Sequence, residues 1–243
     1  MKIEESIVVP AYNEEKIISK TIDTLHSFLS KYYKNFEIII ADDGSRDSTF
    51  KIAQSIEKKY KNVSIVRNEK NMGRGSVLTK AFSSAKGDFV AYVDADLAID
   101  VGLLPKLIEC VKNNYDIATG SKHLKNSNVE YGKLRRLLSS FYSLLSRLIL
   151  NCPIRDYQCG MKALKKSSFE KLLPYIREKG WAWDTEVIAL AHYNKMMIAE
   201  LPAVVVNIPY RKSRVAVLRD VYKMFMALLR IRKHKNIISN NKL

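Results

Sequence analysis

Short apolar runs alternate with stretches of helical periodicity along the first half of the chain. Residues 6–9 and 36–41 are almost continuously apolar, as expected for strands buried on both faces of a parallel sheet. Residues 63–66, 89–93 and 116–120 are three further expected strands, and the segments between the strands carry apolar residues three and four positions apart. These strand–helix units predict an α/β fold, a Rossmann-like, mostly parallel sheet with right-handed crossovers and flanking helices on both faces.

Turn and cap residues predict where the first elements begin and end. Pro10 is expected to end the first strand. Asn13 is expected to cap the first helix, with Glu14 in the first turn, where the helix dipole favours acids. The second helix is expected to start at Asp47 or Ser48.

The second half of the chain is less regular and contains two basic amphipathic segments. Residues 133–150 place leucines and Phe141 on one face, with arginines and serines around the other, and residues 214–235 repeat this theme. Such a helix either packs in a core or lies at a membrane interface, and frequency alone favours the core. Glu200-Leu-Pro202 is expected to introduce a strand at 204–208.

The charge of the chain is far from balanced. The net charge is +16 over 243 residues, which indicates an anionic partner: nucleic acid, a membrane surface or phosphorylated substrates. The hydrophobic fraction of 47% and the charged fraction of 27% are those of a globular protein.

Cysteine usage and hydropathy bear on the compartment. Cys110, Cys152 and Cys159 form an odd set without metal-ligand spacing, so a reduced compartment is expected rather than a disulfide framework. No signal-peptide pattern precedes Ile7, and no uncharged apolar run approaches the roughly 20 residues that a membrane-spanning helix needs. We therefore expect a chain that is soluble or lies on a membrane without crossing it.

Two carboxylates follow the apolar run at 89–93. Asp94 and Asp96 are two positions apart, and in an extended segment such side chains point the same way and can reach one ion. Hard oxygen ligands of this kind suit Mg²⁺ or Mn²⁺, which bridge to substrate phosphates. A solvated acidic turn is the alternative, but ligands of open α/β sheets bind outside the carboxyl ends of the strands. The position therefore predicts a metal–diphosphate site.

Several motifs lie in order along nearly the whole chain. They are Val9-Pro-Ala-Tyr-Asn-Glu14, Asp42-Asp-Gly-Ser45, Asn71-Met-Gly-Arg-Gly75, Asp94-Ala-Asp96, Gly120-Ser-Lys122, Asp156-Tyr-Gln-Cys-Gly160 and Glu200-Leu-Pro202. Together they resemble glycosyltransferase family 2, which has the GT-A fold. The Asp-x-Gln-Cys-Gly element narrows the resemblance to the branch that transfers sugars to dolichyl or polyprenyl phosphate. Trp181-Ala-Trp-Asp-Thr-Glu186 is more similar to the glucosyl-transferring members than to the mannosyl-transferring ones.

The resemblance implies a nucleotide-sugar site in the first half of the chain, with Mg²⁺ or Mn²⁺ held by the two aspartates. The residues implied for donor binding are Pro10, Tyr12, Glu14, Asp42, Asp43, Asn71, Gly73, Gly75, Asp94, Ala95 and Asp96. From the residues alone, Tyr12 is as readily a core side chain and Glu14 a capping residue. A single Gly-x-Gly is a weak phosphate signal.

The resemblance also implies a catalytic group formed by Asp156, Asp96 and Lys122. The acceptor would be a phosphate monoester with a second pKa near 6, so it is largely dianionic at neutral pH and needs little general-base help. Asp156 is therefore expected to orient the acceptor or the sugar, with proton abstraction as a second role. Its alternative role is that of a turn aspartate.

Two further groups are expected around the acceptor. Trp181, Trp183, Asp184 and Glu186 are expected to line the sugar or acceptor pocket, with core packing as the equal alternative for the tryptophans. The acceptor phosphate is expected to be bound by Arg135, Arg136, Arg211 and Arg214. The four histidines form no ligand pattern.

Three departures from the family pattern bear on these roles. Ala98 stands where mannosyl-transferring members often have a glutamine, which leaves no third protein ligand for the metal at that position. Lys122 stands for an arginine, so the charge is kept but bidentate phosphate contact is lost. The transmembrane helices of some members are not found in this sequence.

These features predict an inverting, metal-dependent transfer of a hexose from UDP-glucose to a polyprenyl phosphate. The protein is expected at the cytoplasmic face of a membrane, as a peripheral protein. A GDP-mannose-dependent mannosyltransferase is the alternative within the class, and a catalytically silent sugar-nucleotide-binding regulator is an alternative from another class. Charge alone suggests a nucleic-acid-binding protein, but no recognised motif accompanies it, so no nucleic acid is expected as a partner.

The predicted organisation is a GT-A catalytic domain followed by a basic tail. The catalytic domain covers residues 1–210, with a nucleotide-binding half at 1–121 and an acceptor half at 122–210, and a basic amphipathic segment covers 211–243. The expected partners are a nucleotide sugar, a polyprenyl phosphate and anionic lipid headgroups. The sequence leaves open whether the chain forms a homo-oligomer.

Overall fold

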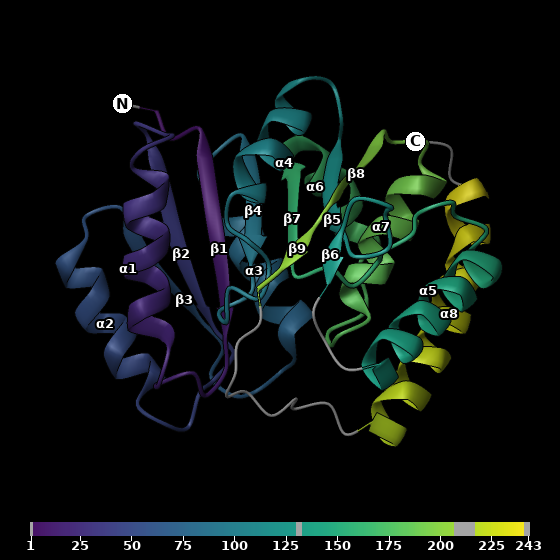
Figure 1. Ribbon diagram of the computed structural model, residues 1–243, viewed down its shortest axis with the longest axis horizontal. Coiled ribbons are helices and arrows are strands. Elements are labelled where there is room, and N and C mark those ends of the chain that lie inside the picture. The colour runs from purple at the N-terminus through teal and green to yellow at the C-terminus, as the bar shows by residue number, and fades with distance from the viewer. Residues whose placement is uncertain (1, 130–132, 207–216, 241–243) are drawn as a thin grey trace.

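The computed structural model describes residues 2–129, 133–206 and 217–240, which form a sheet covered by helices (Figure 1). The strands are β1 (Glu5–Ala11), β2 (Phe36–Asp42), β3 (Val63–Arg67), β4 (Phe89–Val93), β5 (Ile117–Ser121), β6 (Asn128–Val129), β7 (Met161–Lys165), β8 (Ile198–Pro202) and β9 (Val204–Val205). The helices are α1 (Ile18–Leu29), α2 (Thr49–Lys59), α3 (Arg74–Ser84), α4 (Leu103–Lys112), α5 (Lys133–Leu150), α6 (Lys166–Leu172), α7 (Trp183–Tyr193) and α8 (Val217–Asn240), with a short 3₁₀ turn, η1 (Leu173–Tyr175).

The central sheet has the strand order β3-β2-β1-β4-β7-β5-β8. Neighbouring strands are parallel except that β7 runs antiparallel to both β4 and β5. The prediction of a mostly parallel sheet with flanking helices is therefore confirmed. Because β7 comes from the second half of the chain and lies between two strands of the first half, the segments 1–121 and 122–210 share one sheet.

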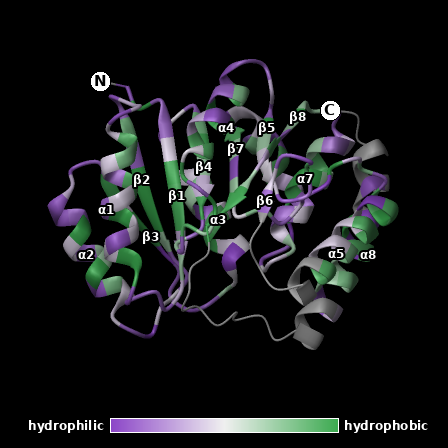
Figure 2. Ribbon diagram, in the orientation of Figure 1, coloured by the Kyte–Doolittle hydropathy of each residue, from purple (hydrophilic) through white to green (hydrophobic). Residues whose placement is uncertain are grey.

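Strand side chains alternate between two helical layers. In β1, Ile7 and Val9 pack into the layer that contains α1, α2 and α4, whereas Val8 packs into the layer that contains α3, α6 and α7. Both faces of the central strands are thus buried, which is why these strands are continuously apolar in the sequence. Figure 2 shows the strands as hydrophobic over most of their length and the outer helices as mixed.

Pro10 does not end β1, contrary to the prediction. The strand continues to Ala11, and Pro10 lies opposite Ala41 of β2. Pairing between β1 and β4 extends only to Val8, opposite Tyr92. Beyond that level β1 has a strand partner on one side alone, and a proline is tolerated where no partner needs its N–H.

Asn13 does not cap α1, which begins at Ile18 after the N-cap residue Ile17. Asn13 has a positive φ of 53°, and its Oδ1 accepts a hydrogen bond from the N–H of Arg46 at 2.8 Å. It joins the loops that follow β1 and β2 instead of starting a helix. Ser48 is the N-cap residue of α2, as predicted.

The Glu200-Leu-Pro202 segment is itself part of β8, so the prediction that it only introduces a strand is wrong. β8 pairs in parallel with β5 at the edge of the sheet. The two-residue β9 follows, and Val206 then donates its backbone N–H to the carbonyl oxygen of Ala98 at 2.8 Å. Residues 207 and 208 of the strand predicted at 204–208 lie outside the described residues.

The apolar side chains of α5 are divided between the core and the surface, so the core packing that frequency favours is confirmed only in part. Leu150 is buried, and Leu145 and Ile149 pack against the core. Leu137, Phe141 and Leu148 are 66%, 57% and 67% exposed, whereas Ser143 and Ser146 are buried. α5 packs beside α8, and the two helices lie together at one side of the molecule (Figure 1). Among the described residues, no helix is both long enough and apolar enough to cross a membrane.

Candidate active site

The predicted donor-binding segments come from the carboxyl ends of neighbouring parallel strands. Ala11 of β1 is level with Asp42 of β2, and Asp42 is level with Arg67 of β3. β4 ends at Val93, directly before Asp94. The structure therefore brings the segments around Pro10, Asp42 and Asp94 to one edge of the sheet, where open α/β sheets bind their ligands.

The loops after β1 and β2 are locked together at this edge. The backbone N–H of Asn13 donates to Ser45 Oγ at 2.9 Å, and the N–H of Glu14 donates to Thr49 Oγ1 at 2.7 Å. Pro10 and Glu14 are buried, and Tyr12 is partly exposed. Of the three predicted residues in this motif, Tyr12 has the side chain that is most open to a ligand.

Asp42 and Asp43 are both buried and organise the protein itself. Asp42 Oδ2 lies 3.0 Å from Arg67 Nε. Asp43 accepts hydrogen bonds on both oxygens, from the N–H groups of Met72 and Gly73 at 2.9 Å each and from the Asn68 amide at 2.8 Å. In this conformation Asp43 fixes the loop at 71–73, so its contacts are those of a structural residue.

Asn71 is exposed, but the two glycines after it face other parts of the chain. Gly73 has a φ of 105°, and a Cβ there would lie 2.9 Å from the carbonyl carbon of Lys179. A Cβ at Gly75 would lie 2.7 Å from Cγ of Trp183. The absence of side chains at both positions is explained by packing, so their surroundings do not support the prediction that they make room for a phosphate or a sugar.

Asp94 and Asp96 follow β4 in a turn, so the prediction of an extended segment is wrong. Leu97 has a φ of 48°, and the N–H of Ala98 donates to Asp96 Oδ1 at 3.1 Å. Ala95 between them is buried, and its carbonyl oxygen accepts from Thr21 Oγ1 at 2.6 Å. Burial raises the pKa of Asp94, Arg74 opposes this rise, and the charge of Asp96 adds to it.

Arg74 joins the predicted metal motif, Asp94-Ala-Asp96, to α7. Its Nη2 donates to Asp94 Oδ1 at 2.7 Å, and its Nη1 donates to Asp184 Oδ2 at 2.6 Å. Burial alone would lower the pKa of Arg74, but the two carboxylates outweigh burial and hold that pKa well above its ordinary value. The guanidinium group therefore stays charged and links two segments that are far apart in the sequence.

Asp184 lies at the centre of this buried network and not in an open pocket. Its Oδ1 accepts from Lys162 Nζ at 3.0 Å and from the hydroxyl of Tyr92. Lys162 is fully buried and also donates to the carbonyl oxygen of Cys159 at 2.9 Å. Burial opposes ionisation of Asp184, but Lys162 and Arg74 outweigh it and hold the pKa of Asp184 below its ordinary value.

Trp183 and Glu186 are core residues, so the predicted pocket-lining role does not fit their burial. Trp183 is 0% exposed, and its Nε1 donates to Thr79 Oγ1 at 2.8 Å. Glu186 is also 0% exposed and accepts the backbone N–H groups of Arg177 and Glu178 at 2.9 and 2.7 Å. Trp181, by contrast, is 47% exposed, and its ring centroid lies 5.7 Å from Cζ of Arg74.

Asp156 and Lys122 lie together on the acceptor side of the predicted site. Asp156 Oδ2 accepts the backbone N–H of Lys122 at 2.9 Å and lies 3.5 Å from its Nζ. Asp156 Oδ1 accepts the N–H of Gln158 at 3.0 Å, which is the contact of a turn aspartate. Both oxygens thus have partners within the protein. This geometry favours a positioning role for Asp156 over proton abstraction.

The loop from Asp156 to Gly160 connects the two parts of the site. At its far end, the carbonyl oxygen of Gly160 accepts the N–H of Asp94 at 3.0 Å. At its near end, the N–H groups of Arg155 and Asp156 donate to the carboxylate of Glu200 at 3.0 Å. The loop is therefore held at both ends, beside the metal motif and beside β8.

The predicted phosphate-binding arginines cannot be placed. Arg211 and Arg214 lie outside the described residues. Arg135 and Arg136 belong to the first turn of α5, and their side chains are outside the described part of the structure.

Asp94 and Asp96 can hold a divalent cation only if a bound substrate supplies further ligands. Among residues 2–129, 133–206 and 217–240, no three His, Cys, Asp or Glu side chains form a group that could hold a metal. Asp94 and Asp96 supply carboxylate oxygens, and Mg²⁺ is typically held by one or two carboxylates together with substrate phosphates and water. A Cβ at Gly160 would lie 2.8 Å from Cγ of Asp94, so residue 160 leaves room for this carboxylate.

Sequence reasoning missed Arg74, Lys162 and Tyr92 as members of the site. Two signals were present. Arg74 is the first residue of α3, where the helix dipole disfavours a cation, so a carboxylate partner is expected. Lys162 stands within the buried strand β7, and a lysine is almost never buried without a partner.

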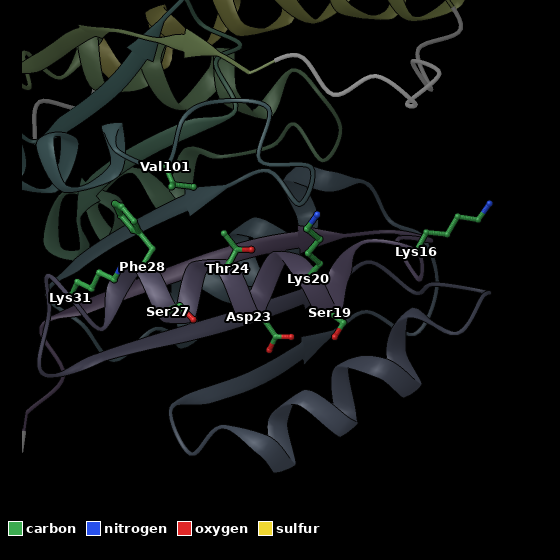
Figure 3. A pocket seen from close by; sticks show the side chains of 9 residues that line it. All are labelled: Lys16, Ser19, Lys20, Asp23, Thr24, Ser27, Phe28, Lys31 and Val101. Atoms are coloured by element: carbon green, nitrogen blue, oxygen red, sulfur yellow. The ribbon is translucent and has the colours of Figure 1, made fainter.

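A separate groove of about 780 Å³ runs along the outer face of α1 (Figure 3). Lys16 and Lys31 lie at its two ends, with Lys20 between them and Phe28 close to Val101. None of the predicted site residues that the structure describes lines it. This groove is therefore distinct from the edge of the sheet that carries Asp94.

The fold and the site define a class of protein. A mostly parallel sheet with donor-site motifs at its carboxyl edge, and an Asp-Ala-Asp turn after β4, are the features of a GT-A glycosyltransferase. The family model described as "Glycosyl transferase family 2" matches residues 6–173, so the chain belongs to glycosyltransferase family 2.

Curated relatives place this chain near the lipid-phosphate branch. It is 36% identical over 233 residues to "Glycosyltransferase AglD" of Haloferax volcanii, covering 94% of this chain and 37% of that protein. It is 33% identical over 211 residues to "Dolichyl-phosphate beta-glucosyltransferase" of Homo sapiens, covering 81% of this chain and 65% of that protein. The chain thus spans about a third to two thirds of the length of these relatives.

A solved structure supports the fold. Glucosyl-3-phosphoglycerate synthase from Mycobacterium tuberculosis, in complex with Mn²⁺, UDP and glucosyl-3-phosphoglycerate, superposes with a TM-score of 0.64 at 19% identity. The match covers 96% of this chain and 80% of that chain. At this identity the likeness is evidence of the GT-A fold alone.

Proposed function

We propose that this chain transfers a hexose from a nucleotide sugar to a polyprenyl phosphate, with inversion at the anomeric carbon. UDP-glucose is the donor we expect, because the human relative is named a dolichyl-phosphate beta-glucosyltransferase and Trp181-Ala-Trp-Asp-Thr-Glu186 is similar to glucosyl-transferring members. GDP-mannose is the alternative donor.

One observation carries the proposal: the loop at 155–160 links the metal motif to the exposed apolar helix α5. Gly160 contacts the backbone of Asp94 at one end of the loop. At the other end, Ser143 on the inward face of α5 donates to the carbonyl oxygen of Arg155. An acceptor whose chain stays in a bilayer under α5 would thus have its phosphate close to Asp156, next to the donor edge.

The reaction we propose is a single in-line displacement. An oxygen of the lipid phosphate attacks the anomeric carbon, the bond from that carbon to the diphosphate breaks, and the nucleoside diphosphate leaves with the bonding electrons. The attacking phosphate is already largely dianionic at neutral pH, so positioning by Asp156 and Lys122 suffices without a strong base. A bound Mg²⁺ or Mn²⁺, held by Asp94 and Asp96, would stabilise the charge on the departing diphosphate.

The remaining site roles stay part of this proposal. Tyr12 and the partly exposed face of the Asp94 turn would contact the donor. The phosphate of the acceptor would be bound by Arg135, Arg136, Arg211 and Arg214. Residues 1–210 would form the catalytic domain, with 211–243 as a basic segment that helps to hold the protein at the cytoplasmic face of a membrane.

Donor screening on vesicles tests the proposal. The purified chain is incubated with vesicles that contain polyprenyl phosphate and with labelled UDP-glucose, GDP-mannose or UDP-N-acetylglucosamine in separate reactions. Labelled lipid from UDP-glucose is the expected product. Product from GDP-mannose alone would establish the mannosyl alternative. Nucleotide-sugar binding without product from any donor would favour the silent regulator.

A further inference from the structure

Two distant parts of the chain define the surroundings of the Asp94 carboxylate, one at each oxygen. Oδ1 accepts from Nη2 of Arg74 at 2.7 Å. Oδ2 occupies space that a side chain at residue 160 would take, because a Cβ built on Gly160 would overlap Oδ2 and would come within 2.8 Å of Cγ. The backbone N–H of Asp94 also donates to the carbonyl oxygen of Gly160 at 3.0 Å.

Arg74 is itself fixed, so its contact with Asp94 has a defined direction. The side chain of Arg74 is only 12% exposed, and Nη1 donates to Asp184 Oδ2 at 2.6 Å. Asp184 is held in turn by Lys162, whose Nζ lies 3.0 Å from Oδ1. A planar guanidinium can bridge two carboxylates in this way, whereas a lysine ammonium is a single compact charge.

We propose that Arg74 and Gly160 are positioning residues that set the orientation of Asp94 before a divalent cation binds. Arg74 engages Oδ1, and the absence of a side chain at residue 160 gives Oδ2 its place. The inference rests on the proposed function, in which Asp94 and Asp96 hold Mg²⁺ or Mn²⁺. A ligand held in its binding rotamer by its surroundings loses less conformational freedom when the metal arrives.

This arrangement accounts for two sequence features that the proposed reaction does not use. The Asp156-Tyr-Gln-Cys-Gly160 motif ends in a glycine because any side chain there would displace the carboxylate of Asp94. The helix α3 begins with an arginine, against the helix dipole, because two carboxylates are placed to receive it.

The charge of Arg74 and its geometry act in opposite directions on cation binding. The positive charge repels a divalent cation nearby, whereas the bridge to Asp184 orients Asp94. An Arg74→Lys variant separates the two effects, since it keeps the charge but cannot bridge both carboxylates. Weaker cation binding by this variant is therefore attributable to lost positioning.

The test measures Mn²⁺ binding by the loss of the free-ion electron paramagnetic resonance signal, with the full chain and saturating UDP. Gly160→Ala should raise the dissociation constant for Mn²⁺ at least tenfold, and Arg74→Lys at least threefold. Gly180→Ala is the matched glycine control, because no atom lies within 4 Å of a Cβ placed at residue 180. Arg230→Lys, at an arginine paired with Glu178, is the matched arginine control. The dissociation constant for Mn²⁺ of both control variants should stay within twofold of the wild-type value. Circular dichroism checks the fold of each variant.

The outcomes separate this inference from the proposed function. Wild-type affinity for Mn²⁺ in both Gly160→Ala and Arg74→Lys would overturn the inference while leaving the transferase proposal intact. Tighter binding by Arg74→Lys would overturn the part assigned to Arg74. A wild-type chain that transfers sugar but binds no Mn²⁺ would also overturn the inference. The expected losses of affinity in a chain that makes no lipid-linked product would support it and refute the proposed function.

Discussion

Gly75 and Trp183 are in such close contact that no side chain fits between them. A Cβ at residue 75 would lie 2.7 Å from Cγ and 2.9 Å from Cδ1 of the tryptophan. The indole is fully buried and packs edge-on against Phe82 and Tyr92, with ring centroids 5.8 and 6.2 Å away. The contact joins α3 to α7.

Gly75→Ala should therefore destabilise the fold through overpacking. Forcing an extra methyl group into a closely packed contact typically costs about 1–3 kcal/mol in the free energy of unfolding. Urea denaturation followed by tryptophan fluorescence measures the loss, with Gly180→Ala as the control. An unchanged midpoint for Gly75→Ala would show that α3 and α7 can separate without cost.

Asp184→Asn should be one of the most destabilising single changes in the chain. It removes the carboxylate that compensates Arg74 and the fully buried Lys162, and breaking a buried ion pair typically costs about 3–5 kcal/mol. Asp23→Asn is the matched control, because the ion pair of Asp23 with Lys59 is exposed and such pairs contribute about 0–1 kcal/mol.

The double variant Asp184→Asn with Lys162→Met should recover part of that loss, because it removes one of the cations that the first change leaves buried. Chemical denaturation of the single and double variants gives the coupling energy between the two positions. Additive losses in the double variant would show that Lys162 and Asp184 do not depend on each other.

Glu186 should make the stability of the fold fall as the pH rises. Burial raises the pKa of this carboxyl from 4.5 to about 7, so the folded chain holds a proton there that the unfolded chain loses. The folded state is thus favoured most below pH 4.5, and this advantage disappears as the pH rises from there through about 7. The size of the effect is at most roughly 3 kcal/mol.

Glu186→Gln should flatten this dependence, since the amide does not titrate and its oxygen can still accept the two backbone N–H groups of Arg177 and Glu178. Thermal unfolding of the wild type and of the variant between pH 5 and pH 8 measures how steeply the stability of each falls with pH. If the variant kept the slope of the wild type, another group would be responsible for it.

Most of the fold follows from local patterns in the sequence. The strands β1, β2 and β4 are almost continuously apolar because helices cover both of their faces, and the helices between the strands carry regular apolar spacing. The place of β7 could not be deduced in this way. Its insertion between β4 and β5 depends on long-range pairing, and no local signal distinguishes an antiparallel strand in an otherwise parallel sheet.

The site was predictable in its position but not in its inner contacts. Asp94 and Asp96 follow an apolar run, so a position at the edge of the sheet could be inferred. The burial of Trp183 and Asp184 could not, because it depends on how α7 packs against α3. The exposure of apolar side chains on α5 was equally hidden, since an amphipathic pattern shows that a helix has two faces but not which of them the protein covers.

Replacement of Asp96, a predicted metal ligand, should greatly lower the transfer rate without unfolding the chain. Asp96 is in a partly exposed turn outside the core, so Asp96→Asn should leave the melting temperature nearly unchanged. Loss of charge stabilisation on the leaving group should lower the transfer rate by on the order of 100-fold or more. Asp100→Asn, at an exposed aspartate nearby, is the control and should keep its activity. Full activity in excess EDTA would refute the metal assignment.

The last prediction concerns the exposed apolar side chains of α5 and α8, which we expect to rest on an anionic membrane. On α5 these include Leu137, Phe141 and Leu148, and on α8 they include Tyr222 and Phe225. The two helices that carry them pack together, and large exposed apolar patches typically mark interaction sites, so we expect one here. Basic residues on α8, such as Lys223 and Lys233, would add about 1 kcal/mol each near anionic headgroups.

Flotation with anionic vesicles measures the association. The chain should float at low salt and float less in high salt, because salt screens the basic residues but not the burial of the apolar ones. A triple variant with serine at Leu137, Phe141 and Leu148 should lose most of the remaining binding, since burying each such side chain contributes about 1.5–3 kcal/mol. Tyr32→Ser, at an exposed aromatic residue just after α1, is the control and should float like the wild type. If the unmodified chain stays in the soluble fraction at low salt, these apolar side chains must have another partner.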